Sequence, residues 1–115
     1  MSKLFYGKIF YVLINVVFII QIVASFEKIQ PGTLCSDMGL KEINSEANCQ
    51  AAAAKLNLTW AHSWNGKNEI PGCIFAADWR KKVFYNTSPN PSRSKTNLNA
   101  NYEAICEGIY CFILK

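Results

Sequence analysis

Residues 45–56 read SEANCQAAAAKL, which is the clearest secondary-structure signal in the chain. Its four consecutive alanines favour a helix because alanine loses no side-chain freedom when a helix forms. Ser45, or Asn44 before it, offers a side-chain oxygen to the first free backbone amides, and Glu46 suits the positive end of the helix dipole. The stretch therefore predicts one helix over residues 46–56.

This helix has one apolar face. Four residues recur at the i, i+3, i+4 and i+7 spacing of a single buried stripe: Cys49, Ala52, Ala53 and Leu56. Cys49 is therefore expected to point into the core, and the small alanines let the helix lie close to whatever it covers.

Two apolar segments, 73–77 and 82–86, follow the helix and are separated by residues 78–81. They predict a β-hairpin with a four-residue connection. Because side chains alternate along a strand, Cys73 and Phe75 share one face of the first strand, and one of its two faces should receive the helix.

The remaining segments complete an α+β fold. Thr33 to Cys35 begins a first strand, and Tyr102 to Cys106 returns to the sheet as a last strand or a short turn of helix. Residues 86–101 are rich in Asn, Ser, Thr and Pro, which predicts a long flexible surface loop. We expect one helix packed on a small antiparallel sheet and stabilised by disulfides.

The N-terminal segment predicts export. Basic residues lie near the start of the chain, and residues 9–23 are almost all apolar. Ala24 and Ser25 are small residues of the kind that a signal peptidase recognises. Residues 1–25 are therefore expected to be a signal peptide, and 26–115 a single small extracellular domain that is secreted and has no contact with the membrane. The alternative is an uncleaved anchor, since the apolar run approaches the roughly 20 residues that span a bilayer.

The five cysteines predict disulfides, because export places them in an oxidising compartment. Cys49 faces inward from its helix and Cys73 opens a core strand, so this pair is a natural link between helix and sheet. Among three possible connectivities, we therefore favour Cys49 with Cys73 and Cys35 with Cys106. Cys111, in the apolar tail, is left free or forms an intermolecular disulfide.

The charge of the chain excludes one class of partner. Lys3 and Lys8 are the only two of the twelve Lys and Arg residues before residue 26, so the domain carries ten basic and eight acidic residues. This small excess is not a nucleic-acid signature. The densest basic cluster is Arg80-Lys81-Lys82, which is either a solvated turn or a small contact patch for an anionic group.

Three tryptophans are candidates for binding, because indole rings stack on sugars and anchor protein contacts. Trp60 and Trp64 are expected to cover the small core. Trp79 lies in the predicted turn, where a large apolar ring has little reason to be unless it packs or binds. Candidate binding residues are therefore Trp79, Arg80, Lys81 and Lys82, with Trp60 and Trp64 as weaker candidates.

Motifs for catalysis do not occur. His62 is the only histidine, its neighbour Ser63 points to the opposite side of an extended segment, and no cysteines have the close spacing of zinc ligands. We expect no catalytic residues, no metal site, no cofactor and no enzyme activity. Two sequons, at Asn57 and Asn86, directly follow predicted elements and are expected to lie at exposed boundaries, so they are candidate glycosylation sites if the host is a eukaryote.

The order of elements along the chain resembles that of PAN/apple-like extracellular modules. The elements are a cysteine on an alanine-rich helix, then Pro71-Gly72-Cys73, the strand 82–86 and Ile105-Cys106. The resemblance covers residues 33–106. It implies a helix clipped by a disulfide to an antiparallel sheet, and a secreted non-enzymatic module that binds carbohydrate or protein. The alternative is a small disulfide-stabilised effector such as a toxin, an antimicrobial protein or an inhibitor.

Overall fold

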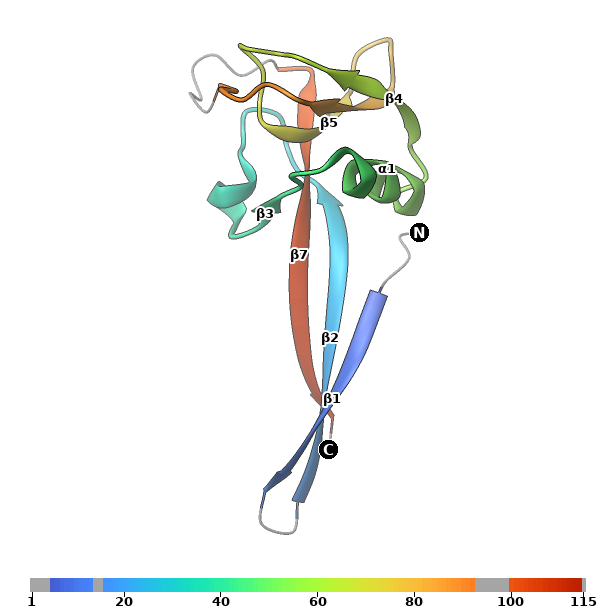
Figure 1. The fold of residues 1–115 in the computed structure, drawn as a ribbon, viewed down its shortest axis with the longest axis vertical. Coiled ribbons are helices and arrows are strands. Elements are labelled where there is room, and N and C mark those ends of the chain that lie inside the picture. The colour runs from blue at the N-terminus through green and yellow to red at the C-terminus, as the bar shows by residue number, and fades with distance from the viewer. Residues whose placement is uncertain (1–4, 14–15, 93–99, 115) are drawn as a thin grey trace.

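The computed structural model describes residues 5–13, 16–92 and 100–114, with side chains described for 25–92 and 100–109. The molecule is elongated, with principal dimensions of 55 × 26 × 22 Å (Figure 1). In chain order the elements are β1 (Phe5–Leu13), β2 (Val16–Lys28), η1 (Cys35–Met38), β3 (Lys41–Glu42), α1 (Glu46–Lys55), β4 (Thr59–Trp64), β5 (Gly72–Ala76), β6 (Lys82–Asn86) and β7 (Tyr102–Leu114).

Helix α1 begins and ends at residues that satisfy its free backbone groups. Ser45 is extended, and its Oγ accepts a hydrogen bond of 3.2 Å from the amide of Asn48. At the other end Asn57 has a positive φ of 57°, and the amides of Asn57 and Leu58 donate to the carbonyls of Ala54 and Ala53. This paired arrangement is a Schellman motif, in which asparagine is one of the few residues that adopt the left-handed conformation readily. The predicted helix is confirmed, one residue shorter than expected.

The sheet is seven-stranded, in the order β1-β2-β7-β5-β6-β4, with β3 on the edge of β7. The predicted hairpin is present, since β5 and β6 pair antiparallel from Gly72 opposite Asn86 to Ala76 opposite Lys82. One pair differs from the expected antiparallel sheet, because β4 runs parallel to β6. The reason is the insertion of β6 between β4 and β5, which run in opposite directions, so β6 cannot be antiparallel to both.

A long ribbon of β1, β2 and β7 extends away from the helix (Figure 1). β2 and β7 pair antiparallel from Ile19 opposite Leu114 to Lys28 opposite Ile105, and β1 pairs with β2 alone. The segment expected to be a signal peptide contains β1 and the part of β2 up to Ser25. The helix, both disulfides and strands β3–β6 all lie after that point. Within the described ranges, no helix has both the length and the apolar character needed to cross a membrane.

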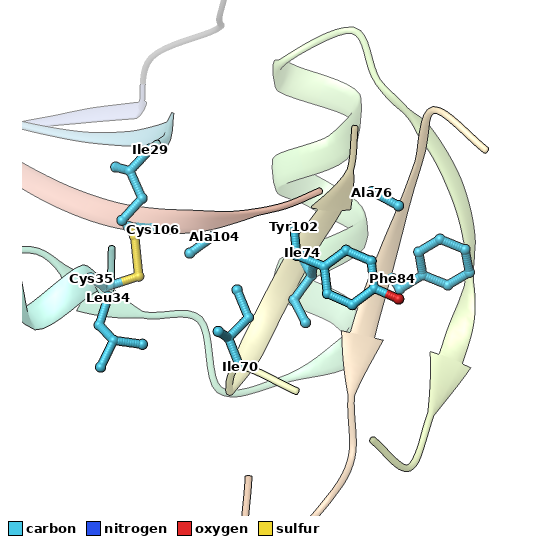
Figure 2. Close-up of a cluster of buried hydrophobic side chains, with 10 residues drawn as sticks. All are labelled: Ile29, Leu34, Cys35, Ile70, Ile74, Ala76, Phe84, Tyr102, Ala104 and Cys106. Carbon is cyan, nitrogen blue, oxygen red and sulfur yellow. A yellow bond between two sulfur atoms is a disulfide. The ribbon is translucent and has the colours of Figure 1, made fainter. Parts of the chain in front are cut away.

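The core has two parts, one on each face of the sheet. Under α1 the buried residues are Ile43, Cys49, Ala52, Ala53, Cys73, Phe75, Val83 and Ile105. On the opposite face they are Ile29, Leu34, Cys35, Ile70, Ile74, Ala76, Phe84, Tyr102, Ala104 and Cys106 (Figure 2). One face of the first hairpin strand receives the helix, as expected, and it is the face with Cys73 and Phe75.

Both predicted disulfides are present, one in each part of the core. Cys49–Cys73 joins α1 to β5, with a Cα–Cα distance of 5.3 Å. Cys35–Cys106, which Figure 2 shows, joins η1 to β7, with a Cα–Cα distance of 5.6 Å. The backbone of Cys111 lies in β7 opposite Ile22, and its side chain is outside the described part.

The expected first strand at residues 33–35 is wrong, because Cys35–Met38 forms the 3-10 helix η1. The carboxylate of Asp37 accepts a hydrogen bond of 2.9 Å from the amide of Leu34, which closes a tight turn instead of extending the chain. Gly39, with φ of 68°, then ends the turn in a conformation that favours glycine.

Candidate functional site

The connection between β5 and β6 is cross-linked by hydrogen bonds from its own side chains. The guanidinium of Arg80 donates to both carboxylate oxygens of Asp78, at 2.6 to 3.1 Å, and the Arg80 amide donates to the same carboxylate at 2.9 Å. These hydrogen bonds hold the pKa of Asp78 below its usual range and raise the pKa of Arg80. Lys81, with φ of 49°, donates from Nζ to the carbonyl of Ala77 at 2.7 Å.

Arg80 also ties this turn to the sheet. A guanidinium nitrogen donates to the hydroxyl of Tyr102 at 2.9 Å. The central carbon of the Arg80 guanidinium lies 5.2 Å from the ring centre of Tyr102 and 5.4 Å from that of Phe84. Both rings belong to the part of the core that Figure 2 shows. The charge of Arg80 is therefore balanced by Asp78, and its guanidinium lies near two core rings, so Arg80 links the turn to the sheet.

Trp79 belongs to this turn and is hardly covered by it. Its side chain is 89% exposed, the highest value among the large hydrophobic residues of the described part. The two others that are exposed, Met38 and Ile109, lie on other elements. Of the two expectations for Trp79, packing or contact, the structure removes packing, because hardly any of the ring is covered.

A shallow depression lies beside Trp79 on the sheet face opposite α1. It is lined by Ala61, His62, Trp79, Arg80, Lys82 and Phe84. Lys82 opens β6 and is exposed, and no hydrogen bond or ion pair within the described residues engages its ammonium group. The depression therefore combines one free cation, one exposed indole and no carboxylate in its lining.

Strand β4 forms the far wall, and an irregularity in its pairing decides which side chains reach the site. The register of β4 against β6 shifts between Trp60 and His62. Trp60 consequently packs on the helix side, whereas His62 and Trp64 contact Phe84 edge-on at 5.1 and 5.4 Å on the other side. Trp60 and Trp64 are thus partly buried packing residues, as expected, and His62 and Phe84 join the site without having been predicted.

The two sequons differ in exposure. Asn57 is exposed after α1. Asn86, however, is only 4% exposed, and its Nδ2 donates to the carbonyls of Gly66 and Ile70 at 2.9 and 2.8 Å. The expectation that both sequons lie at exposed boundaries is therefore wrong for Asn86, because its amide holds the 66–70 loop against the end of β6.

Metal-binding groups are not gathered anywhere in the described residues, since no three His, Cys, Asp or Glu side chains lie together there. No family model, curated protein or solved structure matches the chain.

Proposed function

We propose that the protein is a secreted, non-enzymatic binding module that recognises an extracellular carbohydrate or protein through the surface around Trp79. The observation that carries this proposal is the exposure of the Trp79 indole on a turn that is cross-linked by hydrogen bonds. A tryptophan in this position leaves apolar area in water that a monomer ordinarily buries, and such rings are frequent anchors of binding sites. The PAN/apple-like resemblance supports the same class of function.

The hydrogen bonds of the turn also favour binding. Binding is weakened when a side chain or loop must be ordered on contact, so a pre-organised anchor retains more of its contact energy. Arg80 and Lys81 make hydrogen bonds to Asp78 and Ala77 within the turn, and Arg80 reaches Tyr102 in β7. The indole is thus presented on a fixed base.

The test begins with the secreted protein on a glycan array and in pull-downs from extracellular fluid, followed by Trp79→Ala on each ligand found. We expect Trp79→Ala to weaken binding by about 1 to 3 kcal/mol, as for an interface anchor, with an unchanged melting temperature. Met38→Ala removes a second exposed apolar side chain, 58% exposed and on η1, and is the matched control. Equal affinity of wild type and Trp79→Ala for every ligand would contradict the proposal.

A further inference from the structure

We infer that the surface around Trp79 takes an anionic polysaccharide, with a sugar ring against the indole of Trp79 and a sulfate or carboxylate of the sugar against Lys82. This inference rests on the proposed function and specifies its ligand.

The cations of the turn are not equivalent. Arg80 is paired with Asp78 at 2.6 Å, and the ammonium of Lys81 is bonded to the carbonyl of Ala77. Lys82 alone among the three adjacent basic residues has no such partner within the described residues, and it lines the same depression as Trp79. The positive charge that remains available to a ligand is therefore that of Lys82, the last residue of the basic cluster, which borders the depression.

The electrostatic setting favours an anion beside Lys82. None of the residues that line the depression is acidic. Asp78 is next to it in sequence, but its carboxylate is occupied by Arg80. Glu69 acts on Arg80 electrostatically and is not part of the lining. An anionic group that enters the depression thus meets the Lys82 ammonium and no competing carboxylate.

The apolar part of the surface matches a sugar ring better than a protein. A protein interface of standard size buries about 1,200–2,000 Å² around a core of several apolar side chains. Here one indole is exposed by itself: Met38 lines a separate depression with Lys28 and Ile29, and Ile109 lies in the ribbon opposite Ala24. A single flat ring beside a cation suits the apolar face and charged substituent of one sugar unit.

The experiment measures binding of the folded, disulfide-bonded protein to dextran sulfate, hyaluronan and uncharged dextran. Dextran sulfate and dextran share a backbone and differ in sulfate, whereas hyaluronan carries carboxylates only. We expect binding to one or both anionic polymers, tighter than to dextran and weaker as NaCl is raised, because salt screens exposed charges. The polymer that binds more tightly identifies the anion.

Two variants and two controls locate the contact. Trp79→Ala should weaken binding roughly tenfold or more and Lys82→Gln roughly two- to fivefold, as for a ring anchor and an exposed ion pair. Lys82→Arg should bind like wild type. Lys41→Gln removes an equal charge from β3, where the side chain is also exposed, and should leave binding unchanged.

Several outcomes overturn the inference. Equal loss in Lys82→Gln and Lys41→Gln would show attraction by net charge alone. Tight binding to dextran that needs Trp79 but not Lys82 would reject an anionic ligand and leave the proposed function standing. Binding to phosphatidylserine vesicles without binding to either anionic polymer would assign the surface to lipid. A protein with no Trp79-dependent ligand of any kind would contradict the proposed function itself.

Discussion

The guanidinium of Arg80 donates a hydrogen bond of 2.9 Å to the hydroxyl of Tyr102, 22 positions further along the chain. Tyr102 is the first residue of β7, so this bond fastens the β5–β6 turn to a central strand of the sheet. The turn that carries Trp79 therefore depends on a contact outside itself. Removing the hydroxyl tests how much that contact contributes.

Tyr102→Phe is expected to lower the free energy of unfolding by about 0.5–1.5 kcal/mol, because it deletes one hydrogen bond and keeps the ring that packs against Arg80. Chemical denaturation with the disulfides intact measures this loss. Tyr85→Phe is the matched control, since no hydrogen bond of its hydroxyl occurs among the described residues, and it should change stability less. Equal effects of the two variants would contradict a stabilising role for the bond.

Gly72 begins β5 at a φ of 81°, and a Cβ on it would lie 2.8 Å from the carbonyl oxygen of Ile43. Gly32 has a similar φ of 78°, but the space around it is open. Gly32→Ala should therefore cost only the left-handed backbone strain, about 1 to 2 kcal/mol. Gly72→Ala should cost more, because it adds a clash with backbone, and its midpoint of denaturation should be the lower of the two. Equal midpoints would show that the chain relaxes around Ile43.

The helix and the hairpin were predictable because their signals are local. Alanine content, the Ser45 cap and the spacing of Cys49 lie within one helix, and the alternation of β5 and β6 lies within one hairpin. The disulfide pairing followed from the inward direction of Cys49. Each of these predictions needed only the spacing of apolar residues within one helix or strand and the positions of the cysteines around it.

The candidate site was predictable only in part, because two of its residues arrive through long-range arrangement. Insertion of β6 between β5 and β4 brings Phe84 next to His62, and the shifted register at Trp60 turns His62 toward it. Neither the parallel pairing nor the shift has a sequence signal of its own. Nothing in the sequence distinguishes Arg80 from Lys82 as a ligand-binding cation, whereas in the folded turn Arg80 is paired with Asp78 and Lys82 has no partner within the described residues.

The two disulfides should contribute unequally to stability. Cys35–Cys106 spans a sequence separation of 71 residues and Cys49–Cys73 one of 24. Loop-closure entropy predicts about 4 kcal/mol for the first and about 3 to 3.5 kcal/mol for the second. Paired Cys→Ser variants, compared by urea denaturation, should show the larger loss for the 35–106 pair. A larger loss for the 49–73 pair would show that the buried position of Cys49 under α1 outweighs chain entropy.

Glu69 is expected to make stability depend on pH. Burial raises the pKa of its carboxyl, although the charge of Arg80 opposes the shift, and Oε2 is buried without a hydrogen-bond partner in the described part. The folded protein holds this proton more tightly than the unfolded chain does. The stability that the proton contributes is therefore complete below the pKa of Glu69 in the unfolded chain, and it is lost as pH rises through the pKa in the folded protein. Glu69→Gln should therefore melt higher than wild type at pH 7, with a smaller difference near pH 4. An identical shift at both pH values would assign the effect to packing.

Glycosylation should distinguish the two sequons. An N-linked sugar replaces one hydrogen of the asparagine Nδ2, and both hydrogens of Asn86 Nδ2 are directed to buried carbonyls, those of Gly66 and Ile70. Protein secreted from eukaryotic cells is therefore expected to carry a glycan on Asn57 and none on Asn86. Peptide mapping before and after enzymatic deglycosylation measures both positions, and a glycan on Asn86 of folded, secreted protein would contradict the buried network.

The same network predicts a difference in stability that needs no glycan. Asn86→Asp keeps the shape of the side chain but removes both donors. The carbonyls of Gly66 and Ile70 then lose their partners, and each loss should lower the free energy of unfolding by about 1–3 kcal/mol. Asn57→Asp changes an exposed residue in the same way, and aspartate also tolerates the left-handed conformation, so it should cost no more than about 0.5 kcal/mol. Expressed in bacteria without glycosylation, Asn86→Asp should denature at a clearly lower urea concentration than Asn57→Asp. Equal midpoints would mean that the 66–70 loop is held by other contacts and that Asn86 is free for modification after all.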